Sequence, residues 1–289
     1  MRSKTAPLLL LMPILLLYGV LIGGGLLHTF VESLGYIPAV GLHEISFSAY
    51  RLNLGDSFAG SMLFSIAIAF VSSSLSTILG FLIACVMTNS GHHPIRTLTQ
   101  RMLQVGVILP YLYVIFMATT FFGQSGMISR VFHLLNITTE PKDFPRLILD
   151  PAGIGMILVF VLKGTPFVAL FSFNILSHVS SRYGHVARTL GASGQTILKR
   201  IYLPLCSSGL VWSSSVLFAY NLGSFEVPYL MGSLRPVTLS AKLYSSFISP
   251  DIRDIPQTMA ANILLLALGL VALTLYAMLV RRLTAGRRR

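Results

Sequence analysis

The stretch HVARTLGASGQTILKRIYLPL, residues 185–205, combines a helical rhythm of apolar residues with a central glycine, a late proline and no acid. It lies between two strongly hydrophobic runs of the chain. Tyr183 just before it, and Val186, Ala187 and Leu190 within it, recur at helical spacing. Such spacing places the four side chains in one apolar stripe. The pattern predicts a helix that presents an apolar face.

Gly191 predicts the end of this helix, because glycine readily adopts the left-handed conformation common at helix ends. Residues from about 193 to 202 then restart a helix with Ile197 and Ile201 on one side, and Pro204 marks the entry into the next hydrophobic run. The result is a helix–turn–helix elbow across one membrane face, stiff enough to transmit a push. The same periodicity also fits an amphipathic loop that anchors to lipid headgroups.

The composition of the whole chain indicates a membrane protein. Of its 289 residues, 54% are hydrophobic and only 10% are charged, against roughly 25% charged residues in a typical globular protein. Several runs reach about 20 residues with almost no charge, the length that crosses the hydrocarbon core as a helix. The sequence therefore predicts an all-α, polytopic protein of six transmembrane helices. The predicted spans are 8–27, 61–87, 103–122, 152–177, 205–225 and 257–280.

Charged residues are distributed very unequally between the two sets of loops. The N-terminus, residues 88–102, residues 178–204 and the tail after 280 carry thirteen cations and no acid, whereas the remaining loops carry all nine acids. Loops rich in Lys and Arg stay in the cytoplasm. We therefore expect both termini and the elbow to be cytoplasmic. The net charge of +12 then reflects topology and attraction to anionic membrane lipid. No basic face with stacking aromatics suggests a nucleic-acid partner.

The spacing within the elbow resembles a known signature. Alanine, glycine, isoleucine, leucine and proline stand at fixed offsets, as Ala187, Gly191, Ile201, Leu203 and Pro204. This resembles the EAA motif of permease subunits from type I, binding-protein-dependent ATP-binding cassette (ABC) importers. The resemblance implies that the elbow docks into a groove of the ATPase subunit. One departure is His185, which stands where the family has a glutamate, so an ion pair made by that carboxylate would be absent.

The resemblance extends over most of the chain. It implies an N-terminal signal-anchor helix and outer loop over residues 1–59, a permease core over 60–280 with its coupling elbow at 180–204, and a basic cytoplasmic tail over 281–289. It also implies the partners: two cytoplasmic ATP-binding subunits, a second permease chain or a copy of this one, and a periplasmic or lipid-anchored solute-binding protein. Localisation in a bacterial inner membrane follows.

Two short segments concern the solute. GSFEVPYLMG, residues 223–232, is similar to a segment in permeases of polyamine, ferric-iron, thiamine and phosphonate importers. DIRDIPQTMA, residues 251–260, is most like the spermidine/putrescine branch. The resemblance thus favours a polyamine such as spermidine or putrescine, with ferric iron, thiamine or an aminoalkylphosphonate as alternatives.

The residues of an enzyme or of a cofactor site are not evident in the sequence. It contains no G-x-x-x-x-G-K-[ST] phosphate-binding loop, and its seven histidines are scattered without a catalytic or metal-ligand pattern. Cys85 and Cys206 fall at hydrophobic positions and suit packing. We therefore expect no catalytic activity, no metal and no cofactor in this polypeptide, with ATP hydrolysed by a separate subunit.

A few polar residues at membrane depth are candidates for the solute pathway, because ionisable groups there are costly. Lys163, beside Gly164 and Pro166 in a predicted kink, could line a pathway, or it could snorkel or bind a carbonyl that the kink exposes. The other candidates are near the end of the fifth span: Tyr220, Asn221 and Glu226.

Two other functions remain open from sequence alone. The first is a secondary transporter driven by an ion gradient, although no internal repeat and no carboxylate in mid-span support it. The second is a membrane scaffold whose basic loops recruit a partner, which does not account for the lysine in the fourth span.

Overall fold

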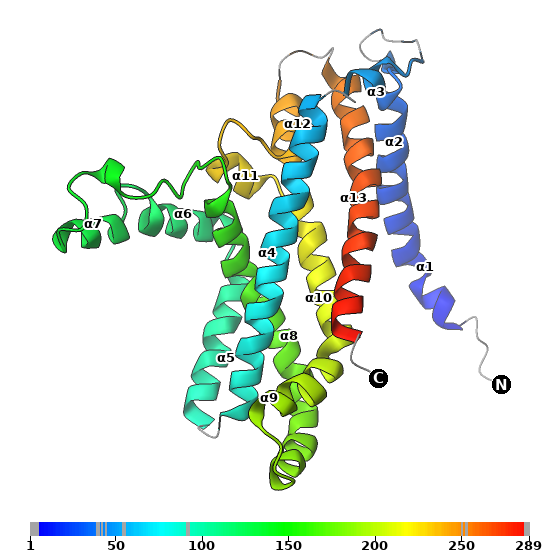
Figure 1. The fold of residues 1–289 in the computed structure, drawn as a ribbon. Coiled ribbons are helices and arrows are strands. Elements are labelled where there is room, and N and C mark those ends of the chain that lie inside the picture. Colours follow the sequence, from blue (N-terminus) through cyan, green and yellow to red (C-terminus); the bar gives the residue numbers. More distant parts are fainter. Residues whose placement is uncertain are drawn as a thin grey trace. The chain divides into compact units, whose positions relative to one another are not determined.

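Every regular element in the described part of the chain is a helix (Figure 1), which confirms the predicted all-α class. The computed structural model describes residues 6–38, 41, 43, 45–53, 56–90, 93–249, 251 and 254–285. Only the backbone is described for residues 6–10, 52–53, 56, 93, 178–182, 185 and 284–285.

The chain divides into two compact units, and the first consists of residues 1–59 and 242–268. Its N-terminal helices are α1 (Ala6–Tyr18), the π-helical turn η1 (Gly19–Gly23), α2 (Gly24–Ser33) and α3 (Ser48–Asn53). The first three form a nearly continuous apolar rod. At its end, the hydroxyls of Ser33 and Tyr50 lie 2.7 Å apart and join α2 to α3.

The second unit consists of residues 60–241 and 269–289 and holds most of the helical bundle. Helices α4, α12 and α13 contribute residues to both units. In chain order the remaining elements are α4 (Asp56–Asn89), α5 (His93–Ile108), α6 (Tyr111–Phe122), α7 (Met127–Leu134), η3 (Pro141–Asp143), α8 (Ile154–Thr189), α9 (Gly194–Ile197), the π-helical turn η4 (Leu198–Tyr202), α10 (Leu203–Gly223), α11 (Glu226–Met231), α12 (Leu239–Phe247) and α13 (Ile255–Ala285).

Six stretches of the described chain are long and apolar enough to cross a membrane, which confirms the predicted number. Several helices run beyond the predicted spans. Helix α4, with 34 residues, is about 50 Å long at 1.5 Å per residue. Helix α8, with 36 residues, continues without interruption from the fourth span into the elbow. The candidate stretches are Leu11–Ser33, Ser57–Asn89, Tyr111–Leu134, Ile154–Ser177, Gly194–Gly223 and Ile255–Leu283.

The third predicted span was wrong in its position. The sequence predicted one helix over residues 103–122, but the chain leaves the helical conformation at Leu109 and Pro110, between α5 and α6. Proline has no backbone N–H, and its ring disfavours a helical conformation at the preceding residue. After this break α6 turns away from the direction of α5 (Figure 1). The third apolar stretch is instead Tyr111–Leu134.

Helices α4 and α8 approach each other closely through small residues. A Cβ atom added at Gly80 of α4 would lie 2.7 Å from the Cβ of Val168, and one added at Gly164 of α8 would lie 2.6 Å from the hydroxyl of Ser76. Small residues of this kind let helix backbones pack tightly inside a membrane. Glycine at position 164 therefore has a packing role, and α8 remains helical through Pro166.

Among the buried clusters that hold the second unit together, two support the elbow and the break after α5. One lies under the elbow, where Phe81 and Cys85 of α4 pack with Val168 of α8 and with Cys206 and Leu210 of α10. Both cysteines are buried and unpaired, in agreement with a packing role. The other joins α6, α8 and α11 and includes Ile115, Phe160 and Val227. The elbow and the break after α5 are thus each anchored on a packed core.

Candidate functional site

The elbow has the predicted turn at Gly191, whose φ angle is +80°. The N–H of Gly191 bonds to the carbonyl of Arg188 at 2.9 Å, and the N–H of Ala192 bonds to that of Ala187 at 2.9 Å. These two bonds form a Schellman motif, which ends a helix with a residue in the left-handed conformation. Ser193 then caps α9 by accepting a bond from the N–H of Thr196. The predicted helix–turn–helix geometry is therefore present.

The two faces of the elbow differ sharply. On the outer face, Tyr183, Val186 and Leu190 are 60%, 57% and 81% exposed and form an apolar ridge along the end of α8. On the inner face, Ile197 and Tyr202 are each only 2% exposed and belong to the cluster under the elbow. The elbow is thus fixed to the bundle on one side and presents unpartnered apolar side chains on the other, within the described residues.

The residues that the sequence assigned to the elbow mostly support this inner face. Ala187, Ile201 and Leu203 are half-buried and pack against the cluster under the elbow. Pro204 stands in the first turn of α10, where a missing N–H costs little. His185 lies in α8, but its side chain is outside the described residues.

Asn89, the last residue of α4, is an elbow residue that sequence reasoning missed. Its Oδ1 atom accepts a 2.6 Å hydrogen bond from Nη2 of Arg188 and a 3.0 Å hydrogen bond from the hydroxyl of Tyr202. The donors lie 99 and 113 residues away in the chain. The only local signal was a polar residue at the end of a hydrophobic span.

Lys163 reaches the break between α5 and α6. Its Nζ atom donates hydrogen bonds to the carbonyls of Gly106, Val107 and Leu109 at 3.2, 2.9 and 2.5 Å. The ammonium group also lies 5.2 Å from the ring centroid of Tyr111. A cation at this position neutralises the carbonyls left unpaired at the C-terminal end of a helix. Carbonyl binding was part of one of the two predicted alternatives, although the carbonyls lie at the end of α5 and just after it, not at a kink in α8.

Tyr111 brings two further candidates together. Its ring stacks on that of Tyr220, with centroids 5.0 Å apart and planes inclined by 20°. Glu226, the exposed first residue of α11, is close enough to interact electrostatically with both tyrosines. Lys163, Tyr220 and Glu226 are therefore neighbours through Tyr111, a residue that the sequence did not single out because it resembles any aromatic in a hydrophobic run.

Asn221 points elsewhere. It is 4% exposed, and its Nδ2 atom donates a 2.8 Å hydrogen bond to the hydroxyl of Ser72 on α4. Its Oδ1 atom has no hydrogen-bond partner among the described residues. The structure thus places Asn221 in the contact between α10 and α4, away from the Tyr111 neighbourhood.

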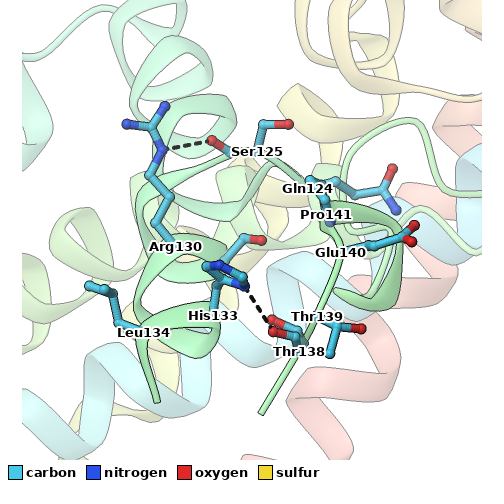
Figure 2. A pocket seen from close by; sticks show the side chains of 10 residues that line it. Gln124, Ser125, Arg130, His133, Leu134, Thr138, Thr139, Glu140 and Pro141 are labelled. Atoms are coloured by element: carbon cyan, nitrogen blue, oxygen red, sulfur yellow. Dashed lines mark hydrogen bonds between the residues drawn. The ribbon is translucent and has the colours of Figure 1, made fainter. Parts of the chain in front are cut away.

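The segment after α6 contains a separate cavity of about 540 Å³ (Figure 2). Within it, Nε of Arg130 donates to the carbonyl of Ser125 at 3.3 Å, and Nδ1 of His133 lies 3.0 Å from the carbonyl of Thr138. No pattern in the sequence predicts this cavity. Its lining residues are Gln124, Ser125, Ser129, Arg130, His133, Leu134, Thr138, Thr139, Glu140 and Pro141.

The carboxylate of Asp143 stabilises a turn of the chain beside this cavity. Its Oδ2 atom accepts hydrogen bonds from the N–H of Glu140 at 2.8 Å and from the N–H and hydroxyl of Thr139 at 3.1 and 2.8 Å. These bonds lower the pKa of the Asp143 carboxyl below its ordinary value, the bond from Glu140 most strongly. Nowhere in the described chain, this segment included, are three His, Cys, Asp or Glu side chains grouped as a metal site would require.

Comparisons with known proteins show which family the chain resembles. Residues 76–285 match the family model described as "Binding-protein-dependent transport system inner membrane component". The chain is 31% identical over 130 residues to the sulfate transport system permease protein CysW of Escherichia coli, a match that covers 45% of this chain and 44% of that protein. The match therefore spans less than half of that relative.

Two further similarities cover more of the chain. It is 24% identical over 213 residues to the spermidine/putrescine transport system permease protein PotB of Escherichia coli, covering 73% of this chain and 74% of PotB. Its fold resembles a chain of a bacterial alginate ABC transporter crystallised with an alginate pentasaccharide-bound periplasmic protein. That match has a TM-score of 0.74 and 16% identity, and it covers 96% of this chain and 94% of the other.

Proposed function

Because the chain belongs to the family of binding-protein-dependent transport system inner membrane components, we propose that it is the transmembrane permease subunit of an ATP-driven importer. The observation that carries the proposal is the elbow. A Schellman turn at Gly191 separates two helical arms, one face is packed on the bundle, and the other presents the apolar ridge of Tyr183, Val186 and Leu190. A ridge of this kind suits the apolar groove of a partner protein.

The partner at the ridge is a cytoplasmic ATPase subunit, present in two copies. ATP-driven closure of the ATPases pulls the elbows of two permease chains together. This movement opens the solute pathway between the two permease chains outward, so that it receives solute from a binding protein. Hydrolysis then allows return to the inward-facing state. The second permease is a sister chain or another copy of this one. The alginate transporter, which was crystallised with a periplasmic protein, supports the expectation of a solute-binding partner.

The solute that we propose is a small organic cation of the polyamine type, with sulfate as the second candidate. Glu226 is exposed and near the stacked rings of Tyr111 and Tyr220, and no salt bridge to it occurs among the residues that the structure describes. Aromatic faces beside a carboxylate favour a cation. Lys163, by contrast, is occupied by carbonyls. The similarity to CysW favours sulfate.

The test uses proteoliposomes that contain the complete transporter, with ATP inside and the binding protein outside. We expect uptake of radiolabelled putrescine or spermidine that requires both ATP hydrolysis and the binding protein, and that falls in the Glu226→Gln variant. ATP-dependent uptake of labelled sulfate alone would select the second solute. Uptake driven by an imposed proton or sodium gradient without ATP would instead support a secondary transporter.

The orientation requires its own measurement. We propose that the termini and the elbow are cytoplasmic, which the excess of cations in those segments supports. A cysteine introduced at exposed Leu190 should react with an impermeant maleimide only after the cell membrane is opened, whereas one at exposed Ile137 should react in intact cells. Cys85 and Cys206 are buried, so they contribute little background. Labelling of position 190 from outside would reject the elbow as a site for a cytoplasmic ATPase.

A further inference from the structure

One amide oxygen holds both arms of the elbow. Asn89 Oδ1, at the end of α4, accepts hydrogen bonds from Arg188 at 2.6 Å and from Tyr202 at 3.0 Å. Arg188 precedes Gly191 and Tyr202 follows it, so the two donors belong to opposite arms of the turn. The bond from Arg188 is exposed to solvent, whereas the bond from Tyr202 is half-buried. In addition to the Gly191 turn and the packed cluster, these two bonds join both arms of the elbow directly to α4.

The position of the Tyr202 hydroxyl is determined by its surroundings. Its side chain is 2% exposed and packs in the cluster under the elbow. The ring passes over Gly184 of α8, where an added Cβ would lie only 2.9 Å from the hydroxyl oxygen. The absence of a side chain at Gly184 thus leaves the space through which Tyr202 reaches Asn89. Packing and hydrogen bonding specify the same arrangement.

Beyond Asn89, α4 is bonded to other parts of the second unit. Ser72 of α4 accepts a 2.8 Å hydrogen bond from Nδ2 of Asn221, and Ser65 accepts one of 2.8 Å from the N–H of Leu239. A displacement of the inner end of α4 therefore acts on α10 and on the beginning of α12 through direct contacts. Rigid helices with such contacts carry coupling between distant sites.

We propose that Asn89 is a positioning residue that makes the elbow and α4 move as one body, so that a displacement imposed on the elbow reaches the bundle through α4. This inference rests on the proposed function, in which the displacement comes from an ATPase. It assigns to α4 the transmission step that the turn at Gly191 cannot perform alone. Asn89 itself contacts neither the ATPase nor the solute in this scheme.

The first test measures the elbow without transport. In the complete transporter in nanodiscs, amide hydrogen exchange of residues 190–198 is compared between wild type, Asn89→Leu and Asn89→Asp. Leucine removes the acceptor at similar size, and aspartate keeps it. We expect exchange about tenfold faster in Asn89→Leu, since two hydrogen bonds are lost, and near wild-type exchange in Asn89→Asp. Equal exchange in all three proteins would overturn the inference.

The second test measures solute molecules moved per ATP hydrolysed in proteoliposomes. In Asn89→Leu we expect this ratio to fall about fivefold or more, a typical scale for lost coupling, and to recover in Asn89→Asp. The matched control is Asn174→Leu, an exposed position on α8, which should keep the wild-type ratio. A wild-type ratio in Asn89→Leu, or no recovery in an assembled Asn89→Asp complex, would refute the coupling role.

The two tests also separate the inference from the function on which it rests. If the wild-type complex shows no ATP-dependent uptake, the proposed function fails and the transport role of Asn89 fails with it. The exchange measurement still decides whether Asn89 holds the elbow. A normal wild-type transporter with an unaltered Asn89→Leu variant rejects the inference alone.

Discussion

The ammonium group of Lys163 lies 2.9 Å from the carbonyl oxygen of Val107, a residue 56 positions earlier in the chain. With its bonds to Gly106 and Leu109, it stabilises the end of α5 at the point where Pro110 separates α5 from α6. The last carbonyls of a helix have no partner within that helix, so they need a donor from elsewhere. The lysine is therefore a structural part of the break.

Replacement of this lysine should destabilise the protein. In Lys163→Met the three carbonyls lose their donor, and losing a hydrogen bond to a charged group costs about 1.5–3 kcal/mol. We expect a lower midpoint of thermal unfolding for the detergent-purified protein. Lys142→Met is the control, since Lys142 forms only an exposed ion pair with Glu140, worth roughly 0–1 kcal/mol. Equal stability of the two variants would mean that the carbonyls find other partners.

The turn at Gly191 has room for a side chain, but its backbone conformation should disfavour a β-branched residue. An added Cβ would meet no atom within 4 Å, so the cost of Gly191→Val comes from its φ of +80°, about 1–2 kcal/mol for a left-handed residue. We expect correct membrane insertion with impaired uptake. Gly60→Val, at an equally open helical glycine of α4, provides the comparison. Normal uptake by Gly191→Val would count against the elbow as the coupling element.

The contact between α10 and α4 should depend on Ser72 and not on the adjacent Ser73. Ser72→Ala removes the acceptor of the Asn221 amide, and hydrogen bonds between membrane helices average about 0.6 kcal/mol and rarely exceed about 2. Among the residues that the structure describes, the Ser73 hydroxyl bonds only to carbonyls of its own helix, so Ser73→Ala should cost less. Thermal unfolding of both variants provides the measurement. A larger loss in Ser73→Ala would place the important contact elsewhere.

The turn closed by Asp143 should loosen in acid. The pKa of this carboxyl is lower in the folded protein than in an unfolded chain, so its stabilising bonds are fully present above the unfolded value and are lost as the pH falls through the folded value. We expect the Thr139 and Glu140 amides to lose hydrogen-exchange protection when the pH is below the range in which carboxyl groups ordinarily titrate. Asp143→Asn should abolish the pH dependence, and unchanged protection of these amides across that range would contradict it.

Local patterns in the sequence were sufficient for much of this structure. Hydrophobic runs predicted the number of membrane-crossing stretches, and the offsets around Gly191 and Pro204 predicted the elbow. These features depend on neighbouring residues alone. Pro110 is evident in the sequence, but the span predicted over residues 103–122 runs through it. Hydropathy averaged over a window of residues does not register the single backbone N–H that a proline lacks.

The remaining features depend on partners that lie far apart in the chain. Nothing near Asn89 indicates that Arg188 and Tyr202 will reach it, and nothing near Lys163 indicates the three carbonyls at the break between α5 and α6. Tyr111 belongs to the same class, since an aromatic residue in an apolar run has no distinctive pattern. The candidate residues were thus identified by chemical type, while their neighbours required the fold.

The serines of α4 have a consequence for movement. The hydroxyls of Ser73 and Ser76 donate to carbonyls of their own helix, at 2.6 and 2.8 Å, whereas those of Ser65 and Ser72 also accept bonds from Leu239 and Asn221. A neighbouring helix that slides past Ser73 and Ser76 exchanges van der Waals contacts without breaking their bonds, which is the shear type of rearrangement. The ease of sliding is then governed by side-chain volume. Alanine in place of Ser73 or Ser76 keeps the side chains on this surface of α4 small, whereas valine adds methyl groups that obstruct the sliding helix.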